Sequence, residues 1–272
     1  ATQLLPLRRT RLKPQNVPCT NYSFASLEDA QRASDELWNY CLYTLQPALE
    51  EFVVPSQDYT AEQLQSAHPP RSPVRVHLAH WQARYTTALS AYLTAHPAQT
   101  AREKLAGDTL RLHALVGTLS LSPPSLADTE EVWGVYTPQF AEIVEVAKRI
   151  LDTESAAVPV GDDAEGGEKV GLDSGVLGPL YLVTLRCRDK DVRRESVELL
   201  AKAGGRREGL WDSRLLAQIA AGVVRKEGGF RGEGGQVRGG KVADVDLVFA
   251  EEGCRAGVKF VMEEEVEAGT EA

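Results

Sequence analysis

The sequence predicts a mostly α-helical fold, an irregular and helical-repeat-like multi-helix domain that ends in a small C-terminal β-hairpin. Three observations predict it. Apolar residues recur at helical spacing in one segment after another, and capping residues and prolines mark the ends of these segments. A run with alternating apolar and polar residues comes near the end, between residues 242 and 261. Hydrophobic residues make up 43% of the 272 residues, which is enough for a packed core.

The first helix is expected to start at Ser26, because Asp29 follows it with the spacing of a capping box. Pro47 is expected to break or kink this helix, since proline lacks the N–H that a helix interior needs. The apolar face of this helix consists of Ala30, Ala33, Leu37, Cys41 and Leu45, and Trp38 and Tyr40 are expected to widen that buried face.

Two further helices follow in the N-terminal half. Ser72 and Pro73 open the first of them, and its inner stripe consists of Leu78, Trp81, Tyr85, Leu89 and Tyr92. Thr100 and Glu103 form a capping box that opens the next helix. That helix stops at the prolines of residues 122–125. A helix with an acidic start at 128–131 then continues to Ile150, with a kink at Pro138.

The central stretch of the chain runs from residue 176 to 218. Its apolar run at 180–185 fits either a buried strand or a buried helix, and Pro179 favours a helix because proline suits a first helical turn. Asp189 is the expected cap of the next helix, which the glycines at 204–205 end. Asp212 or Ser213 is expected to cap the last helix.

The tail carries the signal of a β-hairpin, formed by residues 242–249 and 255–261. We expect Val245, Leu247 and Phe249 to face in one direction, opposite Val258 and Phe260.

The pattern predicts one large helical domain at residues 24–261, with mobile loops near 153–171 and 227–240 because these are rich in glycine and acidic residues. Residues 1–23 are expected to be a linker from a missing N-terminal region, since the chain starts at an alanine. Residues 262–272 are expected to be an acidic tail.

Charge and cysteine spacing argue against several classes of function. A net charge of −9 disfavours a large DNA-binding surface, since phosphate contacts need clustered lysine and arginine. The cysteines Cys19, Cys41, Cys187 and Cys254 lie too far apart for a zinc cluster and are expected to be buried free thiols. No membrane span is expected, and no catalytic motif is present in the sequence.

Charged residues crowd the ends of the central helices. They could form an anion site, but helix caps and arginine–carboxylate pairs that lock the loops between helices are favoured. The residues concerned are Arg186, Arg188, Asp189, Arg193, Arg194, Arg206, Arg207, Glu208 and Asp212, with Trp211 beside them.

Aromatic residues at helical spacing provide a candidate ligand pocket between helices. Core packing is the competing interpretation, because an aromatic stripe of this kind more often faces a core. The candidate lining consists of Trp81, Tyr85, Trp133, Tyr136 and Tyr181.

The order of residues in the central stretch resembles the C-terminal, fungal-specific regulatory domain of fungal binuclear zinc-cluster (Zn2Cys6) transcription factors. The residues that carry this resemblance are Leu180, Tyr181, Cys187, Arg188, Asp189, Arg193, Arg194, Leu199, Leu200, Arg206, Arg207, Glu208, Gly209, Trp211, Asp212 and Ser213. The resemblance is tight over 176–216 and 242–260, and the glycine-rich segment at 227–240 is an insertion relative to the family.

The resemblance implies a nuclear regulatory domain that controls transcription without itself binding DNA. DNA contact, and the zinc cofactor, would then belong to a missing N-terminal domain, and no cofactor is expected in this chain. The implied partners are a small-molecule effector or a coregulator protein, with a homodimer as a further expectation. The alternatives are a stand-alone helical scaffold or interaction protein and, less favoured, an enzyme.

Overall fold

The computed structural model describes residues 21–53, 73–121, 131–157, 170–171, 175–209, 211–227, 242–249 and 256–262. Within these ranges the fold is mostly helical with a C-terminal antiparallel hairpin, which confirms the predicted fold class. The helices are α1 (Leu27–Val53), α3 (Pro73–Ala95), α4 (Ala101–Leu121), α5 (Glu131–Gly134), α6 (Thr137–Ala157), α7 (Leu177–Arg186), α8 (Lys190–Lys202) and α9 (Ser213–Lys226). The hairpin consists of β4 (Val242–Phe249) and β5 (Ala256–Met262).

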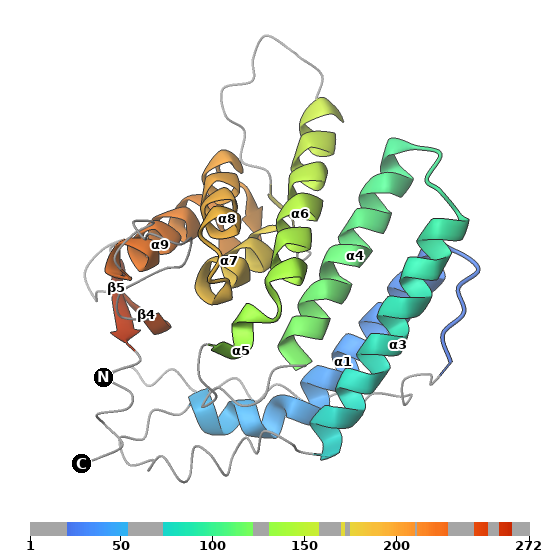
Figure 1. The fold of residues 1–272 in the computed structure, drawn as a ribbon, viewed down its shortest axis with the longest axis horizontal. Helices are drawn as coiled ribbons and strands as arrows, with labels where there is room; N and C mark the ends of the chain where they lie inside the picture. Colours follow the sequence, from blue (N-terminus) through green and yellow to red (C-terminus); the bar gives the residue numbers. More distant parts are fainter. Residues whose placement is uncertain are drawn as a thin grey trace.

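The long helices α1, α3, α4 and α6 lie side by side, the shorter helices α7 and α8 pack against α6, and α9 packs against α7 and α8 (Figure 1). The hairpin lies beside α9, at the edge of the molecule away from α3 (Figure 1). Helix α4 lies between α3 and α6, so its two faces serve two hydrophobic clusters.

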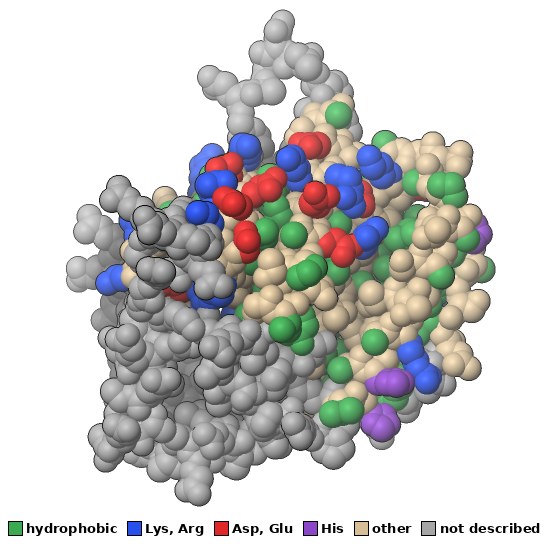
Figure 2. Space-filling view, viewed as in Figure 1, with side chains coloured by type: hydrophobic (Ala, Val, Ile, Leu, Met, Phe, Trp, Pro, Cys, Tyr) green, Lys and Arg blue, Asp and Glu red, His purple; other side chains and the backbone are tan. Residues whose placement is uncertain are grey.

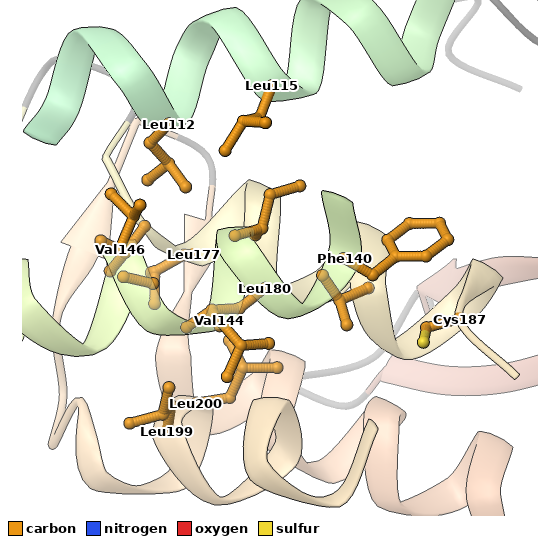
Figure 3. Packing of buried hydrophobic residues seen from close by; sticks show 14 of the residues in the cluster. Leu112, Leu115, Phe140, Val144, Val146, Leu177, Leu180, Cys187, Leu199 and Leu200 are labelled. Atoms are coloured by element: carbon orange, nitrogen blue, oxygen red, sulfur yellow. The ribbon is translucent and has the colours of Figure 1, made fainter. Parts of the chain in front are cut away.

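The larger cluster joins α4 and α6 to α7, α8 and α9. In Figure 3, Leu112 and Leu115 of α4 point toward the side chains of α6 and α7, with Leu199 and Leu200 of α8 below them. Each fully buried leucine of this kind contributes about 2 kcal/mol to folding. The fully buried members of this larger cluster include Phe140, Ile143, Val146, Leu177, Leu180, Val183 and Leu200.

The second cluster joins α1, α3 and α4. Tyr85 is its largest buried side chain, and its hydroxyl donates to the carbonyl of Ala30 at 3.1 Å. Gln82 of α3 donates to the carbonyl of Ala114 at 3.0 Å, and Gly117 leaves room for this amide. Tyr22 packs against this second cluster and contacts Tyr85. The packed domain therefore begins before residue 24, where the predicted linker was expected to end.

Most of the predicted helix starts and stops are confirmed. The N–H of Asp29 donates to Ser26 Oγ, and Thr100 and Glu103 exchange both hydrogen bonds of a capping box. Helix α3 begins at Pro73, and α4 ends at Leu121, just before the prolines. These boundaries depend on nearby residues, which is why the sequence predicts them.

The apolar run at 180–185 is helical, as favoured, within α7. Gly204 and Gly205 end α8 with positive φ angles of 56° and 83°, a backbone conformation that side chains other than glycine disfavour. Asp212 is the residue that caps α9, while Ser213 is the first residue of the helix.

One prediction about a helix break needs correction. The expected kink at Pro138 is a full interruption, since α5 ends at Gly134 and α6 begins at Thr137. Pro138 then lies in the first turn of α6, where its missing N–H costs nothing. Helix α1 continues past Pro47 to Val53 and its C-terminal part changes direction (Figure 1), which agrees with a kink, one of the two outcomes predicted for this proline. Trp38 was expected on the buried face of α1, but 42% of it is exposed.

The bounds of the predicted mobile loops are also wrong where the structure describes them. Residues 153–157 belong to α6, because the helix continues through Thr153 and Ser155, whose hydroxyls bond back to carbonyls four residues earlier. Short strand β1 (Val170–Gly171) pairs with β2 (Arg207–Glu208), which pairs with β3 (Trp211–Asp212). Glu227 is buried at the end of α9. Residues 158–169 and 228–241 lie outside the described ranges.

The hairpin register agrees with the prediction from alternation. Val245 pairs with Phe260 and Leu247 with Val258, with a register shift between Val242 and Asp244. Strand β5 ends at Met262, which was predicted to be the first residue of the acidic tail. Residues 263–272 lie outside the described ranges.

Helices α4, α6 and α8 carry a line of ion pairs on one face, where Figure 2 shows acidic and basic side chains side by side. The pairs are Arg111–Glu142, Asp108–Arg149 at 2.7 Å, and Lys148–Glu195 at 3.3 Å. The two exposed pairs, Arg111–Glu142 and Lys148–Glu195, contribute at most about 1 kcal/mol each. Among the described residues, no helix combines the length and apolar character that a membrane crossing requires.

Cys41 and Cys187 are buried free thiols, as predicted for them. Burial raises the pKa of each thiol to about 11. We therefore expect a thiol-alkylating reagent at about pH 8 to modify both slowly in the folded protein and rapidly after unfolding, since the thiolate is the reactive form. Peptide mass spectrometry of alkylated protein measures this, and rapid labelling of Cys187 in the folded state would contradict it. Cys19 and Cys254 lie outside the described ranges.

Candidate functional site

Most of the charged residues singled out in the sequence gather around α7, the short and mostly apolar helix at the centre of the larger cluster. Two carboxylates from distant parts of the chain position helix α7: Glu208 binds its N-terminus directly, and Glu227 binds Arg193, which donates to the carbonyl of Thr184 near the C-terminal end. Arginines then connect these carboxylates to α6 and α8.

Glu208 provides the N-terminal cap of α7 from 31 to 33 residues away. Its carboxylate accepts hydrogen bonds from the backbone N–H groups of Gly175, Val176 and Leu177 at 2.9 to 3.0 Å. A negative charge at a helix N-terminus is favourable because unpaired N–H groups and the helix dipole point toward it. Gly175 is required for this approach, since a Cβ there would overlap Glu208 Oε1.

Arg206 connects this cap to α6. Its guanidinium donates to Glu208 through Nε and to Glu154 of α6 through Nη1. Burial by itself lowers the pKa of Arg206, but the hydrogen bond to Glu154 and the charge of Glu208 outweigh it and raise the pKa above its ordinary value. The β2 segment is thereby tied to both helices at once.

Glu227 is the second carboxylate, and its side chain is fully buried. It accepts from Arg193 Nη1 and, at 3.1 Å, from Arg188 Nη1, and its Oε1 also accepts from the N–H of Val242 at 2.8 Å. One carboxylate therefore joins α8, the segment between α7 and α8, the end of α9, and β4. We call Arg188, Arg193 and Glu227 the Glu227 network.

Arg193 is a fully buried arginine, and it connects the Glu227 network to α7. Its Nε donates to the carbonyl of Thr184 near the C-terminal end of α7 at 2.7 Å. Burial lowers the pKa of Arg193, and the charge and hydrogen bond of Glu227 oppose that shift. Ser196 adds a bond from α8 to the carbonyl of Leu180 at 2.6 Å.

The remaining charged residues act as caps or surface pairs. Asp189 accepts from the N–H groups of Asp191 and Val192 and caps α8. Arg194 pairs with Asp191 at 2.8 Å on the surface, and Arg207 pairs with Asp212 at 3.2 Å. The structure thus places Asp189 in a helix cap, Arg194 in a pair within α8, and Arg207 in a pair between β2 and β3.

Asp212 caps α9, and this cap predicts a pH dependence. The N–H of Leu215 donates to the carboxylate and, with Arg207, holds the pKa of Asp212 below its ordinary value. A lowered folded pKa means that the contribution is present above the unfolded pKa and disappears as the pH falls through the folded one. We expect Asp212→Ala to cost about 1 kcal/mol at neutral pH.

The cost of Asp212→Ala should shrink as the pH falls below about 4, whereas Asp212→Asn should retain most of the cap at neutral pH. Urea denaturation at neutral and acidic pH measures both variants. A cost of Asp212→Ala that stays constant down to about pH 2 would contradict the role of the charged carboxylate.

The five aromatic residues of the predicted pocket lie in two different clusters. Trp81 and Tyr85 pack with α1 and α4, whereas Trp133, Tyr136 and Tyr181 pack against the larger cluster. A shallow groove of about 720 Å³ runs along α3 and is lined by Thr86, Thr87, Ser90, Ala91, Thr94 and Ala95, none of which belongs to the predicted set. The aromatic ligand pocket remains a prediction.

The outer side of α7 carries aromatic contacts instead. The guanidinium of Arg186 lies 5.6 Å from the ring centre of Trp133, in cation–π geometry. The rings of Tyr181 and Trp211 lie 5.9 Å apart, and 41% of Trp211 is exposed. Trp211 is thus one of the large apolar side chains that a partner could reach.

Sequence reasoning missed Glu154, Ser196 and Glu227. Their partners lie 52, 16 and 34 residues away, so no local spacing connects them. Glu227 also precedes a run of glycines, which made it look like part of a loop. A signal did exist for it, since α9 is strongly amphipathic up to Val224 and Glu227 follows only three residues later.

The charged side chains around α7 hold helices and strands together. Within the described ranges, no group of three or more histidine, cysteine, aspartate or glutamate side chains is placed to hold a metal ion. The buried carboxylates are already engaged by arginines and backbone N–H groups.

Comparison with known proteins gives one partial match to a curated protein. A segment of 56 residues, 21% of this chain, is 38% identical to a protein described as the Aspercryptin biosynthesis cluster-specific transcription regulator atnN of Emericella nidulans. The match spans 9% of that protein. No family model matches the chain, and no solved structure matches it.

Over this short segment the chain is therefore similar to a fungal transcription regulator.

Proposed function

We propose that this chain is the regulatory domain of a fungal zinc-cluster transcription factor, which controls transcription in the nucleus without itself binding DNA. The observation that carries the proposal is the similarity to a fungal transcription regulator over 56 residues. The resemblance of residues 176–216 to the fungal-specific regulatory domain supports it further, as does a net charge of −9, which opposes binding to phosphate.

Within this proposal, DNA and zinc are bound by another domain of the full protein, and the present domain acts through a coregulator protein. Trp211 and the Arg186–Trp133 pair support that kind of partner, because tryptophan, tyrosine and arginine dominate the binding energy of protein interfaces. A small-molecule effector is the competing partner.

A fusion of the full chain to an unrelated sequence-specific DNA-binding domain tests the proposal in fungal cells. We expect reporter transcription to differ from that with the DNA-binding domain alone. Fusions carrying Trp211→Ala or, as a matched control at another exposed tryptophan, Trp38→Ala separate surface contact from general destabilisation. A fusion that leaves the reporter unchanged would contradict a regulatory role and favour a stand-alone scaffold.

DNA binding by the unfused chain provides the second test. We expect no sequence-specific binding to duplex DNA by fluorescence anisotropy at about 0.15 M salt. Tight and salt-resistant binding to one sequence would show that this domain itself contacts DNA and would overturn the proposal.

A further inference from the structure

The β4–β5 hairpin is attached to α9 by a backbone hydrogen bond and by apolar contacts. The N–H of Val242 donates to Glu227 at 2.8 Å, and Val242 itself is buried. Val245 and Phe260 pack against the cluster formed by Ile219 and Val223 of α9. The hairpin thus covers an apolar face to which Tyr181 and Leu185 of α7 also contribute.

The hydrogen bond between Val242 and Glu227 joins the two ends of a chain segment. Its two ends lie 15 residues apart in sequence, with residues 228–241 between them. A chain of that length spans up to about 45 Å when extended, so the covalent connection permits β4 to leave α9 without disturbing the helix. The noncovalent contacts alone keep the hairpin in place.

Gly222 shows that α9 is adapted to this contact. Glycine is a poor residue for the middle of a helix, yet it occupies a buried position in α9. A Cβ at this position would lie 2.6 Å from Cζ of Phe260, closer than two carbon atoms can approach. The missing side chain therefore makes room for the ring of the hairpin at the expense of helix stability.

The polar contact of the hairpin is also part of the Glu227 network. The carboxylate that accepts from Val242 accepts from Arg193, which donates in turn to the carbonyl of Thr184 in α7. When β4 leaves, Glu227 loses the hydrogen bond from Val242, and its carboxylate is left with the two arginines as its partners.

We propose that the β4–β5 hairpin is a releasable strap over the apolar face of α7 and α9, and that its release is coupled through Glu227 to the packing of α8 on α7. Any molecule that captures the hairpin, or the face beneath it, then alters the α7–α8 pair. The inference concerns the fold itself and holds whether or not the chain regulates transcription.

Gly222→Ala tests the strap in the full chain. The new methyl group displaces Phe260, whereas alanine improves α9 as a helix, so release is separated from general destabilisation. We expect amide hydrogen exchange in β4 and β5 to accelerate at least about ten-fold, with a smaller acceleration in α8 and none in α3. Gly134→Ala is the matched control, because a Cβ there meets nothing within 4 Å.

Phe260→Ala removes the aromatic ring itself and should accelerate hydrogen exchange at the same amides. Unchanged exchange in the hairpin of both variants would overturn the strap. Faster exchange in the hairpin with unchanged exchange in α8 would overturn the coupling.

The coupling must also operate in the reverse direction. Arg193 touches Glu227 and Thr184, and Arg193→Lys keeps the charge but loses the guanidinium geometry. We expect it to accelerate exchange in β4 and β5. Ser196→Ala is the matched control, since Ser196 joins α8 to α7 through Leu180 without touching Glu227. Hairpin exchange that responds equally to both variants would show that the effect does not pass through Glu227.

Discussion

Glu227→Gln is expected to destabilise the protein by about 3–5 kcal/mol, because the substitution leaves a fully buried guanidinium opposite a neutral amide. The side chain keeps nearly the same shape, so the lost charge is the main change. Arg193 is the residue most affected, since burial already disfavours its charged form and Glu227 is the carboxylate that offsets this. Urea denaturation followed by circular dichroism gives the free energy of unfolding by linear extrapolation.

Glu195→Gln is the matched control for this prediction. Glu195 also pairs with a basic residue on another helix, Lys148, but about half of each side chain is exposed. Its loss should cost less than about 1 kcal/mol. If the two variants differ by less than about 1 kcal/mol, the Glu227 network does not hold the helices as inferred.

The second large effect is expected for Glu208→Ala, at about 3 kcal/mol. The substitution leaves the N–H groups of Gly175, Val176 and Leu177 without their acceptor in a largely buried site. It also deprives Arg206 of one of its carboxylates. Glu208→Gln should cost less, because an amide oxygen still accepts at the start of α7. The measurement is again denaturant unfolding, with hydrogen exchange of the first turn of α7 as a local readout.

Glu154→Gln separates the cap from the ion pair. Glu154 binds the same Arg206 but donates nothing to and accepts nothing from α7 in the described structure, and it is more exposed than Glu208. Glu154→Gln should therefore lower the free energy of unfolding by less than Glu208→Ala does. An equal loss in both variants would mean that Arg206, and not the cap, carries the stability.

The helices and the hairpin could be predicted because their signals are local. Ser26, Thr100 and Asp189 cap helices whose first N–H groups lie two or three residues away. Alternation in 242–249 predicts which side chains share a face of the hairpin, and the pairing of Val245 with Phe260 agrees.

The candidate site could be predicted in kind but not in detail. Arginines between helices indicated ion pairing with carboxylates, and Arg188, Arg193 and Arg206 do pair with carboxylates. Their partners could not be named, because Glu227 and Glu154 come from other helices at sequence distances that carry no pattern. The sequence analysis predicted a kink at Pro138, whereas the structure has a full interruption before α6. A proline in such a pattern fits both a kinked helix and the start of a new one.

By itself, the sequence determined which segments are helices, where most of them start and stop, that the tail pairs as a hairpin, and which kind of regulator the chain resembles. The tertiary structure alone decided that Glu208 caps α7, that Glu227 joins two arginines to the hairpin, and that the aromatic residues divide between two clusters. The physical reason is range. Caps and periodicity act over a few residues, whereas a buried charge takes its partner from whichever distant segment the packing of apolar faces brings beside it.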